Sequence, residues 1–227
     1  KYQELDDCLS EAGFLVVRYD LRGHGEAKGD RGDVQSFYEM IDDLEEIITY
    51  LKGIYTDYEM YTFGHSMGGL ITMIYGLIYG LKEDIKGQIF TAPESDVPIK
   101  GFSVCMLNYL SYILPKLKIK NPMFIKNNPY YDNQYLDEMT LRFSREMFIK
   151  APKYLKSNIE KYVTPCLLIH GDDDRWMPIY NSEYVIDKMM SKNKEFVRLS
   201  NVGHGVLLSN KKNEGIQLII EYPHSFY

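Results

Sequence analysis

The sequence of 227 residues has few cysteines, no long apolar run and no excess of positive charge. Cys8, Cys105 and Cys166 are scattered, and their spacing fits neither a zinc site nor a disulfide framework, so we expect free thiols in a cytoplasmic protein. The formal net charge of −6 argues against a nucleic-acid partner. No apolar run reaches the roughly 18 residues of a membrane-spanning helix, and no signal peptide is recognisable. These absences leave an ordinary globular domain as the main candidate.

The hydrophobic content of 45% is enough for one domain with a full core. Apolar residues recur at helical spacing in some segments and form short continuous runs in others. We expect helices over residues 1–13, 36–51, 67–81, 181–190 and 213–222, and strands over 14–20, 59–63, 85–93, 165–170 and 195–199. This alternation predicts a mostly parallel sheet flanked by helices. The rhythm breaks between residues 94 and 160, so we interpret 1–93 and 161–227 as the core and 94–160 as a cap insertion.

The sequence Gly64-His65-Ser66-Met67-Gly68 lies between an expected strand and an expected helix. A serine on a tight strand-to-helix turn is held out toward a base and toward backbone N–H groups, which is what a serine nucleophile needs. Glycines at 64 and 68 suit a turn in which strand and helix approach closely. The alternative is an ordinary turn that happens to contain a serine.

Two other reactive groups also follow expected strands. The cluster Asp172-Asp173-Asp174 follows the strand at 165–170, and His204 follows the strand at 195–199. Because the carboxyl ends of parallel strands share one edge of a sheet, we expect these groups to meet Ser66 there. An imidazole would act as general base, and a buried carboxylate would orient it. Taken singly, the histidine could be structural and the aspartates could serve turn or capping roles.

Several motifs together resemble one family. They are Tyr19-Asp20-Leu21-Arg22-Gly23-His24-Gly25, the glycine-rich loop at 29–32 followed by Phe37, Gly64-His65-Ser66-Met67-Gly68-Gly69, residues 170–178 (HGDDDRWMP) and Gly203-His204. In order and spacing they resemble the monoglyceride lipase and lysophospholipase group of α/β-hydrolases, also called serine aminopeptidase-like. The resemblance covers nearly the whole chain and implies an α/β-hydrolase fold with a helical cap.

The resemblance also implies roles for individual residues. It implies Ser66 as nucleophile, Asp174 as the acid, His204 as base and the Met67 backbone N–H as an oxyanion donor, with no cofactor and no metal. It implies structural roles for Asp20, Arg22 and His24. A second oxyanion donor is expected on an early loop, commonly an H-G segment after a leading strand. No such strand precedes Lys1, so we expect the leading strands to be absent from this sequence.

The insertion should determine specificity. The helical spacing of Met106, Leu110 and Ile113 predicts an amphipathic helix that lines an acyl pocket, although ordinary packing of a lid would give the same pattern. No acidic residue occurs from 97 to 131, and five lysines fall at 100, 116, 118, 120 and 126. A basic amphipathic segment of this kind can contact an anionic membrane surface. The alternative is a solvated lysine face.

The combined interpretation is a serine hydrolase that cleaves carboxylic esters of lipid-like substrates, monoacylglycerol or lysophospholipid, through an acyl-enzyme. Its partner is then a small-molecule ester with an acyl chain. Two alternatives stay open. One is an esterase for small aryl or short-chain substrates. The other is a non-catalytic binding protein with a hydrolase-like fold, which would follow if the second oxyanion donor is truly missing.

Overall fold

The structure is a computed structural model that describes residues 2–82, 85–96, 102–121 and 135–226. Its α-helices are α1 (Gln3–Glu11), α2 (Tyr38–Ile54), α3 (Met67–Ile78), α4 (Phe102–Ile113), α5 (Leu141–Arg145), α6 (Ala151–Asn158), α7 (Ile179–Lys188) and α8 (Lys212–Glu221). Its strands are β1 (Tyr61–His65), β2 (Gly87–Thr91), β3 (Lys118–Lys120), β4 (Glu138–Thr140), β5 (Cys166–Gly171) and β6 (Lys194–Leu199). Short helical segments are η1 (Glu146–Lys150), η2 (Ile159–Lys161), η3 (Val206–Leu208) and η4 (Tyr222–Phe226).

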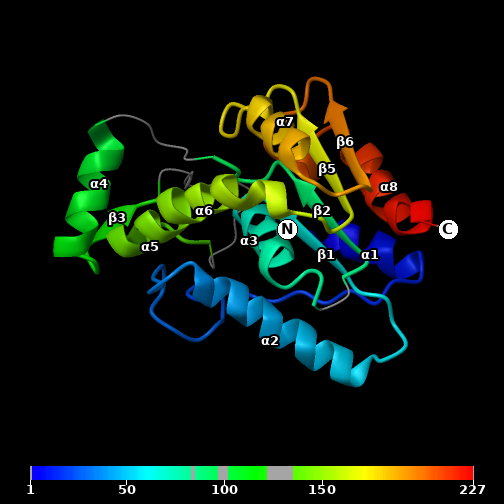
Figure 1. Ribbon diagram of the computed structural model, residues 1–227, viewed down its shortest axis with the longest axis horizontal. Coiled ribbons are helices and arrows are strands. Elements are labelled where there is room, and N and C mark those ends of the chain that lie inside the picture. The colour runs from blue at the N-terminus through cyan, green and yellow to red at the C-terminus, as the bar shows by residue number, and fades with distance from the viewer. Residues whose placement is uncertain (1, 83–84, 97–101, 122–134, 227) are drawn as a thin grey trace.

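The main sheet has four parallel strands in the order β1-β2-β5-β6 (Figure 1). Every residue of the central strands β2 and β5 is buried, as expected of strands covered on both faces. The parallel sheet predicted from the sequence is therefore confirmed. All four strands end at the same edge, and the chain leaves that edge at Ser66, Ala92, Asp172 and Ser200.

Helices cover both faces of the sheet (Figure 1). On one face, α2, α3, α6 and α7 form a large core with β2 and β5, in which Leu70, Ile74, Phe90 and Leu168 are fully buried. On the other face, α1 and α8 pack on the sheet through Leu5 and Ile216. Apart from α6, for which no helix was predicted, these helices fall where helical spacing predicted them, because a surface helix must turn its apolar stripe toward the sheet.

The strand predicted over residues 14–20 was wrong. This segment pairs with no strand of the described chain. Leu15 and Val17 are 50% and 47% exposed, and β1 is left at the edge of the sheet. An apolar run indicates a preference for burial, but a strand also needs a hydrogen-bonded neighbour. The segment instead lines a cavity that β1 also lines.

Residues between β2 and β5 form a separate layer of helices and a short antiparallel pair, β3 and β4 (Figure 1). The helical segments α5, η1 and α6 follow one another directly, and η1 is a π-helical turn. Leu155 of α6 belongs to the main core, so the last part of this layer packs on the body. The division at residues 94 and 160 stays a prediction. No helix in the described part of the chain is both long and apolar enough to cross a membrane.

Candidate active site

Ser66 lies on the turn between β1 and α3, and its backbone is strained. Its φ of 55° and ψ of −119° are uncommon for a residue with a side chain. The turn is held by two hydrogen bonds: the Ser66 N–H donates to Thr91 O at 3.0 Å, and the Glu94 N–H donates to Ser66 O at 3.0 Å. Because these two hydrogen bonds hold the strained Ser66 backbone in place, its hydroxyl stays at the edge where the strands end.

The glycines around this turn differ in what they allow. A Cβ at Gly64 would overlap the Gly68 carbonyl, and a Cβ at Gly69 would lie 2.8 Å from Pro93 Cβ. A Cβ at Gly68 would meet nothing within 4 Å. The close approach predicted from the sequence therefore depends on Gly64 and Gly69, and the prediction for Gly68 was wrong. Met67 is the first residue of α3, where helix N–H groups have no partner within the helix.

The structure brings Ser66, His204 and Asp174 together. His204 Nε2 lies 2.9 Å from Ser66 Oγ, and His204 Nδ1 lies 2.7 Å from Asp174 Oδ2. The Asp174 side chain is completely buried, whereas that of His204 is 14% exposed. This is the geometry in which a histidine accepts the serine proton while a carboxylate fixes the tautomer and stabilises the imidazolium.

Asp174 is held as a carboxylate. Burial alone would raise its pKa, but hydrogen bonds from His170 and His204 hold the pKa well below the usual range for aspartate. The backbone N–H groups of Trp176 and Met177 donate to its Oδ1, each at 2.9 Å. A carboxylate with this many donors stays ionised at neutral pH and can stabilise a positive charge on His204.

His170 is a buried support that the sequence analysis missed. Its Nε2 lies 3.1 Å from Asp174 Oδ2 and 2.8 Å from Met177 O, and its Nδ1 lies 2.7 Å from Ser182 Oγ. Because Nε2 faces two acceptors, we assign the ring proton to Nε2 and let Nδ1 accept from the Ser182 hydroxyl. The motif position just before Gly171 was the available signal, but only the fold shows that His170 contacts Asp174.

The other two aspartates of the cluster, Asp172 and Asp173, do not contact His204. Asp172 Oδ1 accepts a hydrogen bond from the Asn201 N–H at 2.7 Å and so ties the β5 loop to the β6 loop. The side chain of Asp173 is 65% exposed, and its carboxylate lies 3.6 Å from Arg175. Of the three carboxylates, Asp174 is the one that contacts His204.

The motif before α2 forms a compact loop. Arg22 Nε donates to Asp43 Oδ2 of α2 at 2.9 Å, and Asp20 Oδ2 accepts from the Glu26 N–H at 2.9 Å. His24 Nδ1 lies 3.0 Å from Arg22 O, and burial lowers the His24 pKa. These contacts are within the loop and to α2, as structural roles require, although Asp20 and His24 also border the cavity.

A cavity of about 640 Å³ opens beside Ser66 and His204. Residues 14–21 and β1 line part of it. The insertion contributes four apolar side chains to the lining: Leu136, Met139, Phe143 and Phe148. A volume of this size is in the range of small-molecule sites. Among the described residues, no group of three or more histidine, cysteine, aspartate or glutamate side chains is arranged to hold a metal ion.

Met106, Leu110 and Ile113 do not line this cavity in the structure. Met106 and Ile113 are 49% and 55% exposed, and Leu110 is half-buried. The helix predicted from their spacing does form, as α4, but it lies at the far end of the insertion layer from β6 (Figure 1). The apolar side chains that the insertion adds to the lining come instead from Leu136, β4, α5 and η1, whose short segments gave no clear periodicity.

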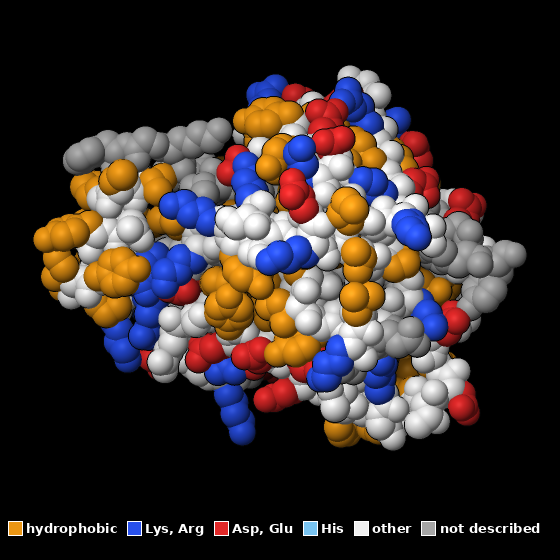
Figure 2. Space-filling view, viewed as in Figure 1, with side chains coloured by type: hydrophobic (Ala, Val, Ile, Leu, Met, Phe, Trp, Pro, Cys, Tyr) orange, Lys and Arg blue, Asp and Glu red, His pale blue; other side chains and the backbone are white. Residues whose placement is uncertain are grey.

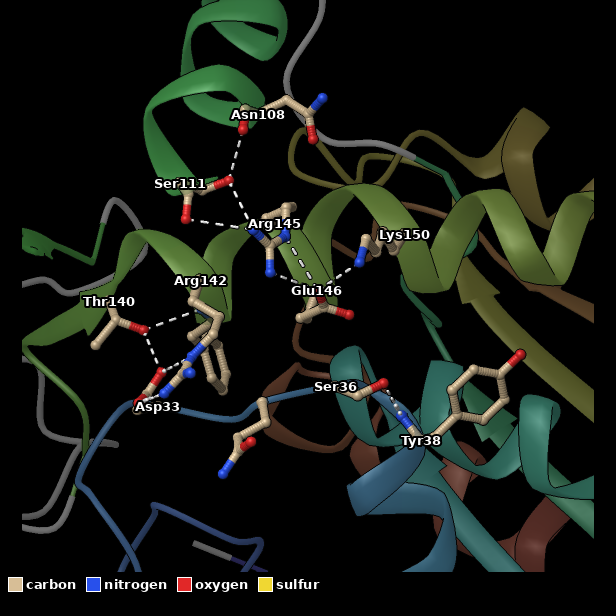
Figure 3. A network of polar contacts seen from close by, with 12 residues as sticks. Asp33, Ser36, Tyr38, Asn108, Ser111, Thr140, Arg142, Arg145, Glu146 and Lys150 are labelled. Atoms are coloured by element: carbon tan, nitrogen blue, oxygen red, sulfur yellow. Dashed lines mark hydrogen bonds and ion pairs between the residues drawn. The ribbon is translucent and has the colours of Figure 1, made fainter. Parts of the chain in front are cut away.

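Two polar networks hold the insertion layer in place (Figure 3). Asp33, before α2, accepts hydrogen bonds from Thr140 Oγ1 at 2.7 Å and Arg142 Nε at 3.1 Å. Arg142 and Thr140 keep the pKa of Asp33 below its usual range even though burial opposes this. Because Thr140 also caps α5 through the Phe143 N–H, this network fixes the start of α5 on the body.

The second network ties α4 to η1 (Figure 3). Arg145 donates to Glu146 Oε1 and, at 3.3 Å, to Ser111 O, and its guanidinium lies 4.2 Å from the Tyr112 ring centre. Lys150 donates to the same Glu146 oxygen at 2.8 Å. The Arg145 and Glu146 side chains are both buried, and each charge is neutralised by the ion pair between them.

Glu94 is a second site residue that the sequence did not reveal. It follows β2, is 2% exposed, and borders the cavity together with Ser66, Met67 and His204. Its Oε1 has no hydrogen-bond partner in the described part of the chain. Burial without a compensating charge raises the pKa of Glu94 well above the usual range. In the sequence, Pro93-Glu94-Ser95 gives no sign of this, since it is typical of an ordinary polar turn.

Comparisons with known proteins agree with the fold. The sequence profile of a family described as serine aminopeptidase, S33 (Hydrolase_4) matches residues 1–211. An uncharacterized abhydrolase domain-containing protein of Dictyostelium discoideum is 26% identical over 98% of this chain, which spans only 24% of that protein's length. A monoacylglycerol lipase of Mycolicibacterium smegmatis is 22% identical, with 85% of this chain and 71% of that protein covered.

Solved structures give the same result for the fold. The crystal structure of Paleococcus ferrophilus monoacylglycerol lipase superposes with a TM-score of 0.84 and 24% identity, covering 97% of this chain and 87% of that one. At this identity the likeness establishes an α/β-hydrolase fold, as predicted from the sequence, and leaves the chemistry to be argued from the residues.

Proposed function

Since the chain belongs to the serine aminopeptidase S33 family of α/β-hydrolases, we propose that it is a serine hydrolase that cleaves carboxylic esters of lipid-like substrates, monoacylglycerol or lysophospholipid. One observation carries the proposal: the hydrogen-bonded series Ser66, His204 and Asp174 opens on a cavity with apolar walls. Relatives that carry the names monoacylglycerol lipase, monoglyceride lipase and phospholipase YtpA support the lipid class.

Acylation begins at Ser66. Its Oγ attacks the ester carbonyl carbon while the hydroxyl proton passes to His204 Nε2, and the carbonyl oxygen becomes an oxyanion. Asp174 holds the Nδ1 proton of His204 and stabilises the imidazolium that forms. When the tetrahedral intermediate collapses, the C–O bond to the alcohol breaks, and the alcohol oxygen takes the proton from His204 Nε2. The acyl group is now an ester of Ser66.

Deacylation repeats these steps with water. His204 Nε2 takes a proton from water as it attacks the acyl carbon, and then returns a proton to Ser66 Oγ as the carboxylic acid leaves. The Met67 N–H, at the start of α3, donates to the oxyanion in both halves. Removing one oxyanion donor typically costs about 100- to 1000-fold in turnover.

The acyl chain would lie along Leu136, Met139, Phe143 and Phe148, which border the cavity. Burying each additional methylene there is worth about 0.8 kcal/mol, so kcat/KM should rise roughly fourfold per CH₂ until the cavity is full. The test is the hydrolysis of 1-monoacylglycerols with acyl chains of increasing length, with Ser66→Ala as the blank. A maximum at medium or long chains supports the proposal. A maximum at acetyl or butyryl esters supports the small-substrate esterase instead.

A non-catalytic binding protein is the second candidate. It is favoured by the oxyanion site, because the Met67 N–H is the one donor that we assign to it among the described residues. This candidate predicts that monoacylglycerol ethers bind, that binding survives Ser66→Ala, and that no ester is turned over by folded protein. Any Ser66-dependent turnover excludes it.

We further propose residues 94–160 as a cap that contacts anionic membranes. Figure 2 shows hydrophobic side chains gathered at the end of the molecule where α4 lies. In α4, Tyr109, Tyr112 and Ile113 are 67%, 62% and 55% exposed. The exposed Lys118 and Lys120 follow in β3, while Lys100 and Lys126 lie outside the described residues. Aromatic and cationic groups on one surface suit a lipid interface.

The membrane contact is tested by co-sedimentation with vesicles of 70% phosphatidylcholine and 30% phosphatidylserine at low salt. Lys118→Glu/Lys120→Glu should lower the bound fraction, as should raising the salt. If the unmodified protein stays in the supernatant at low salt, the lysines form an ordinary solvated face. The cytoplasmic location expected from the scattered cysteines stays a prediction, and all three thiols are free in the structure.

A further inference from the structure

Glu94 is unusual among the acidic residues of the described chain because it is buried without a partner. Its side chain borders the cavity, and its Oε1 is hidden from solvent with no hydrogen bond. Burying an unpaired polar atom of this kind destabilises the fold more than burying an apolar side chain of the same shape. Such a group next to Ser66 calls for a hydrogen-bonding partner in the molecule that the cavity binds.

The backbone around Glu94 is built to hold it there. Ala92, the residue after β2, has a φ of 43°, a backbone conformation that residues other than glycine rarely adopt. Pro93 packs against Gly69 at the start of α3, and the Glu94 N–H is bonded to Ser66 O. The same strained turn therefore fixes both the Glu94 backbone and the Ser66 backbone. The Glu94 side chain therefore starts from a backbone position that is fixed relative to the serine, and it is 2% exposed.

We propose that the Glu94 carboxyl group recognises a hydroxyl group on the alcohol portion of the substrate. This rests on the proposed ester hydrolysis and adds a specificity residue to it. The acyl chain has no donor or acceptor beyond the ester itself, so it cannot satisfy Glu94. The alcohol portion of a glycerol ester carries free hydroxyls, and a hydroxyl both donates and accepts, which matches both atoms of a protonated carboxyl group.

A hydroxyl fits this position better than an ammonium group. In the described chain, no lysine or arginine pairs with Glu94, and burial raises the pKa of its carboxyl group, which favours the protonated form. An ammonium ligand would need the carboxyl to ionise inside an apolar cavity, where both charges lose their hydration. A hydroxyl makes two neutral hydrogen bonds and creates no buried charge. Polyol esters are therefore the substrate class that the cavity selects.

The test measures binding, so that it does not depend on turnover. In a Ser66→Ala background, isothermal titration calorimetry compares 1-O-decylglycerol with decyl propyl ether, which has the same skeleton without hydroxyls. We expect the diol to bind more tightly, and Glu94→Leu to weaken the diol about tenfold while leaving the propyl ether within about twofold. Glu94→Gln should keep part of the preference, because an amide also donates and accepts.

Ser95→Ala is the matched control. Ser95 belongs to the same turn and its buried hydroxyl also has no partner, but it does not border the cavity. We expect it to leave both affinities unchanged. If Glu94→Leu does not fold, Glu94→Met takes its place, since an unbranched side chain keeps the shape of glutamate more closely.

Three results would overturn the inference. One is an unchanged diol affinity in folded Glu94→Leu, and another is an equal loss for both ethers. The third is tighter binding of the decyl ether of ethanolamine than of the diol, with that preference lost in Glu94→Leu. Turnover of 1-monodecanoylglycerol is assayed separately on the unmodified chain. A diol preference that depends on Glu94, without turnover, means that the ester hydrolysis fails and the hydroxyl recognition stands.

Discussion

His204 Nε2 lies 2.9 Å from Ser66 Oγ, although 138 residues separate the two in sequence. Ser66 reaches this position through the turn after β1, and His204 reaches it through the loop after β6, at the other edge of the sheet. The contact therefore depends on all four parallel strands being in register. If it is a catalytic contact, changes at His204 and Asp174 must act on turnover without unfolding the chain.

We predict that Asp174→Asn lowers kcat for ester hydrolysis by about four orders of magnitude, because an amide cannot fix the His204 tautomer or stabilise the imidazolium. His204→Ala should cost at least as much. The control is Asp173→Asn, a neighbour whose side chain is 65% exposed and should leave kcat within about twofold. Steady-state kinetics on variants with an unchanged circular dichroism spectrum makes the comparison. Equal effects at positions 173 and 174 would contradict the assignment.

Gly64 and Gly68 should differ sharply in their tolerance of a methyl group. Gly64→Ala places a Cβ against the Gly68 carbonyl, so either the strand or the helix must move, and we expect a loss of about 2 kcal/mol or more in the free energy of unfolding. Gly68→Ala has open space in α3 and should stabilise the helix by about 0.5–1 kcal/mol. Urea unfolding measures both. Similar losses in the two variants would show that the turn is not packed as described.

Arg142→Met should destabilise the protein by about 3 kcal/mol, because it leaves the carboxylate of Asp33 buried without its cation. Lys116→Met removes a partner of Asp30 in a pair whose side chains are 71% and 73% exposed, and should cost less than about 1 kcal/mol. Chemical unfolding at pH 7 gives both values. If the two variants lose the same amount, Asp33 does not hold the insertion layer as Figure 3 indicates.

Glu94→Gln should change how stability depends on pH. Burial raises the pKa of Glu94, so the folded protein keeps a proton that the unfolded chain releases above about pH 4.3. Stability from this group is therefore lost as pH rises from that value toward the folded pKa, by up to about 1.4 kcal/mol per pH unit. Glutamine has no proton to lose. The variant should gain stability relative to the unmodified protein between pH 5 and pH 8, as measured by thermal unfolding.

A stability difference between the two proteins that is constant over this pH range would show that Glu94 does not titrate abnormally. A difference that grows toward acid pH would mean that the carboxyl is ionised and paired when folded, the opposite sign to the one we predict.

The chain of alternating elements could be predicted from sequence because each element carries its own signal. The α3 segment is apolar throughout, and the continuous apolar run of β5 marks a fully buried strand. The positions of Ser66, Asp174 and His204 could be predicted for the same reason, since each follows a strand directly. A local sequence pattern does not show which strands pair with one another. Residues 14–20 were therefore predicted to join the sheet, whereas in the structure they line the cavity.

The cavity wall and Glu94 depend on tertiary placement. The spacing of Met106, Leu110 and Ile113 identified an amphipathic helix, but spacing does not say which way its apolar side faces. The residues that line the cavity are divided among short segments, so no single period identifies them. Glu94 is notable because its carboxyl group is buried without a partner among the described residues. A sequence pattern does not show this, because the burial arises only when β2, α3 and the insertion layer are assembled.

The most direct test of the account is labelling with a fluorophosphonate, which reacts only with an activated serine. We predict that the folded chain is labelled, that mass spectrometry places the adduct on Ser66, and that Ser66→Ala abolishes labelling. His204→Ala should slow it by several orders of magnitude, because the hydroxyl then has no base. Folded protein that is not labelled, or an adduct on any residue other than Ser66, would contradict the proposal that Ser66, His204 and Asp174 form a working catalytic site.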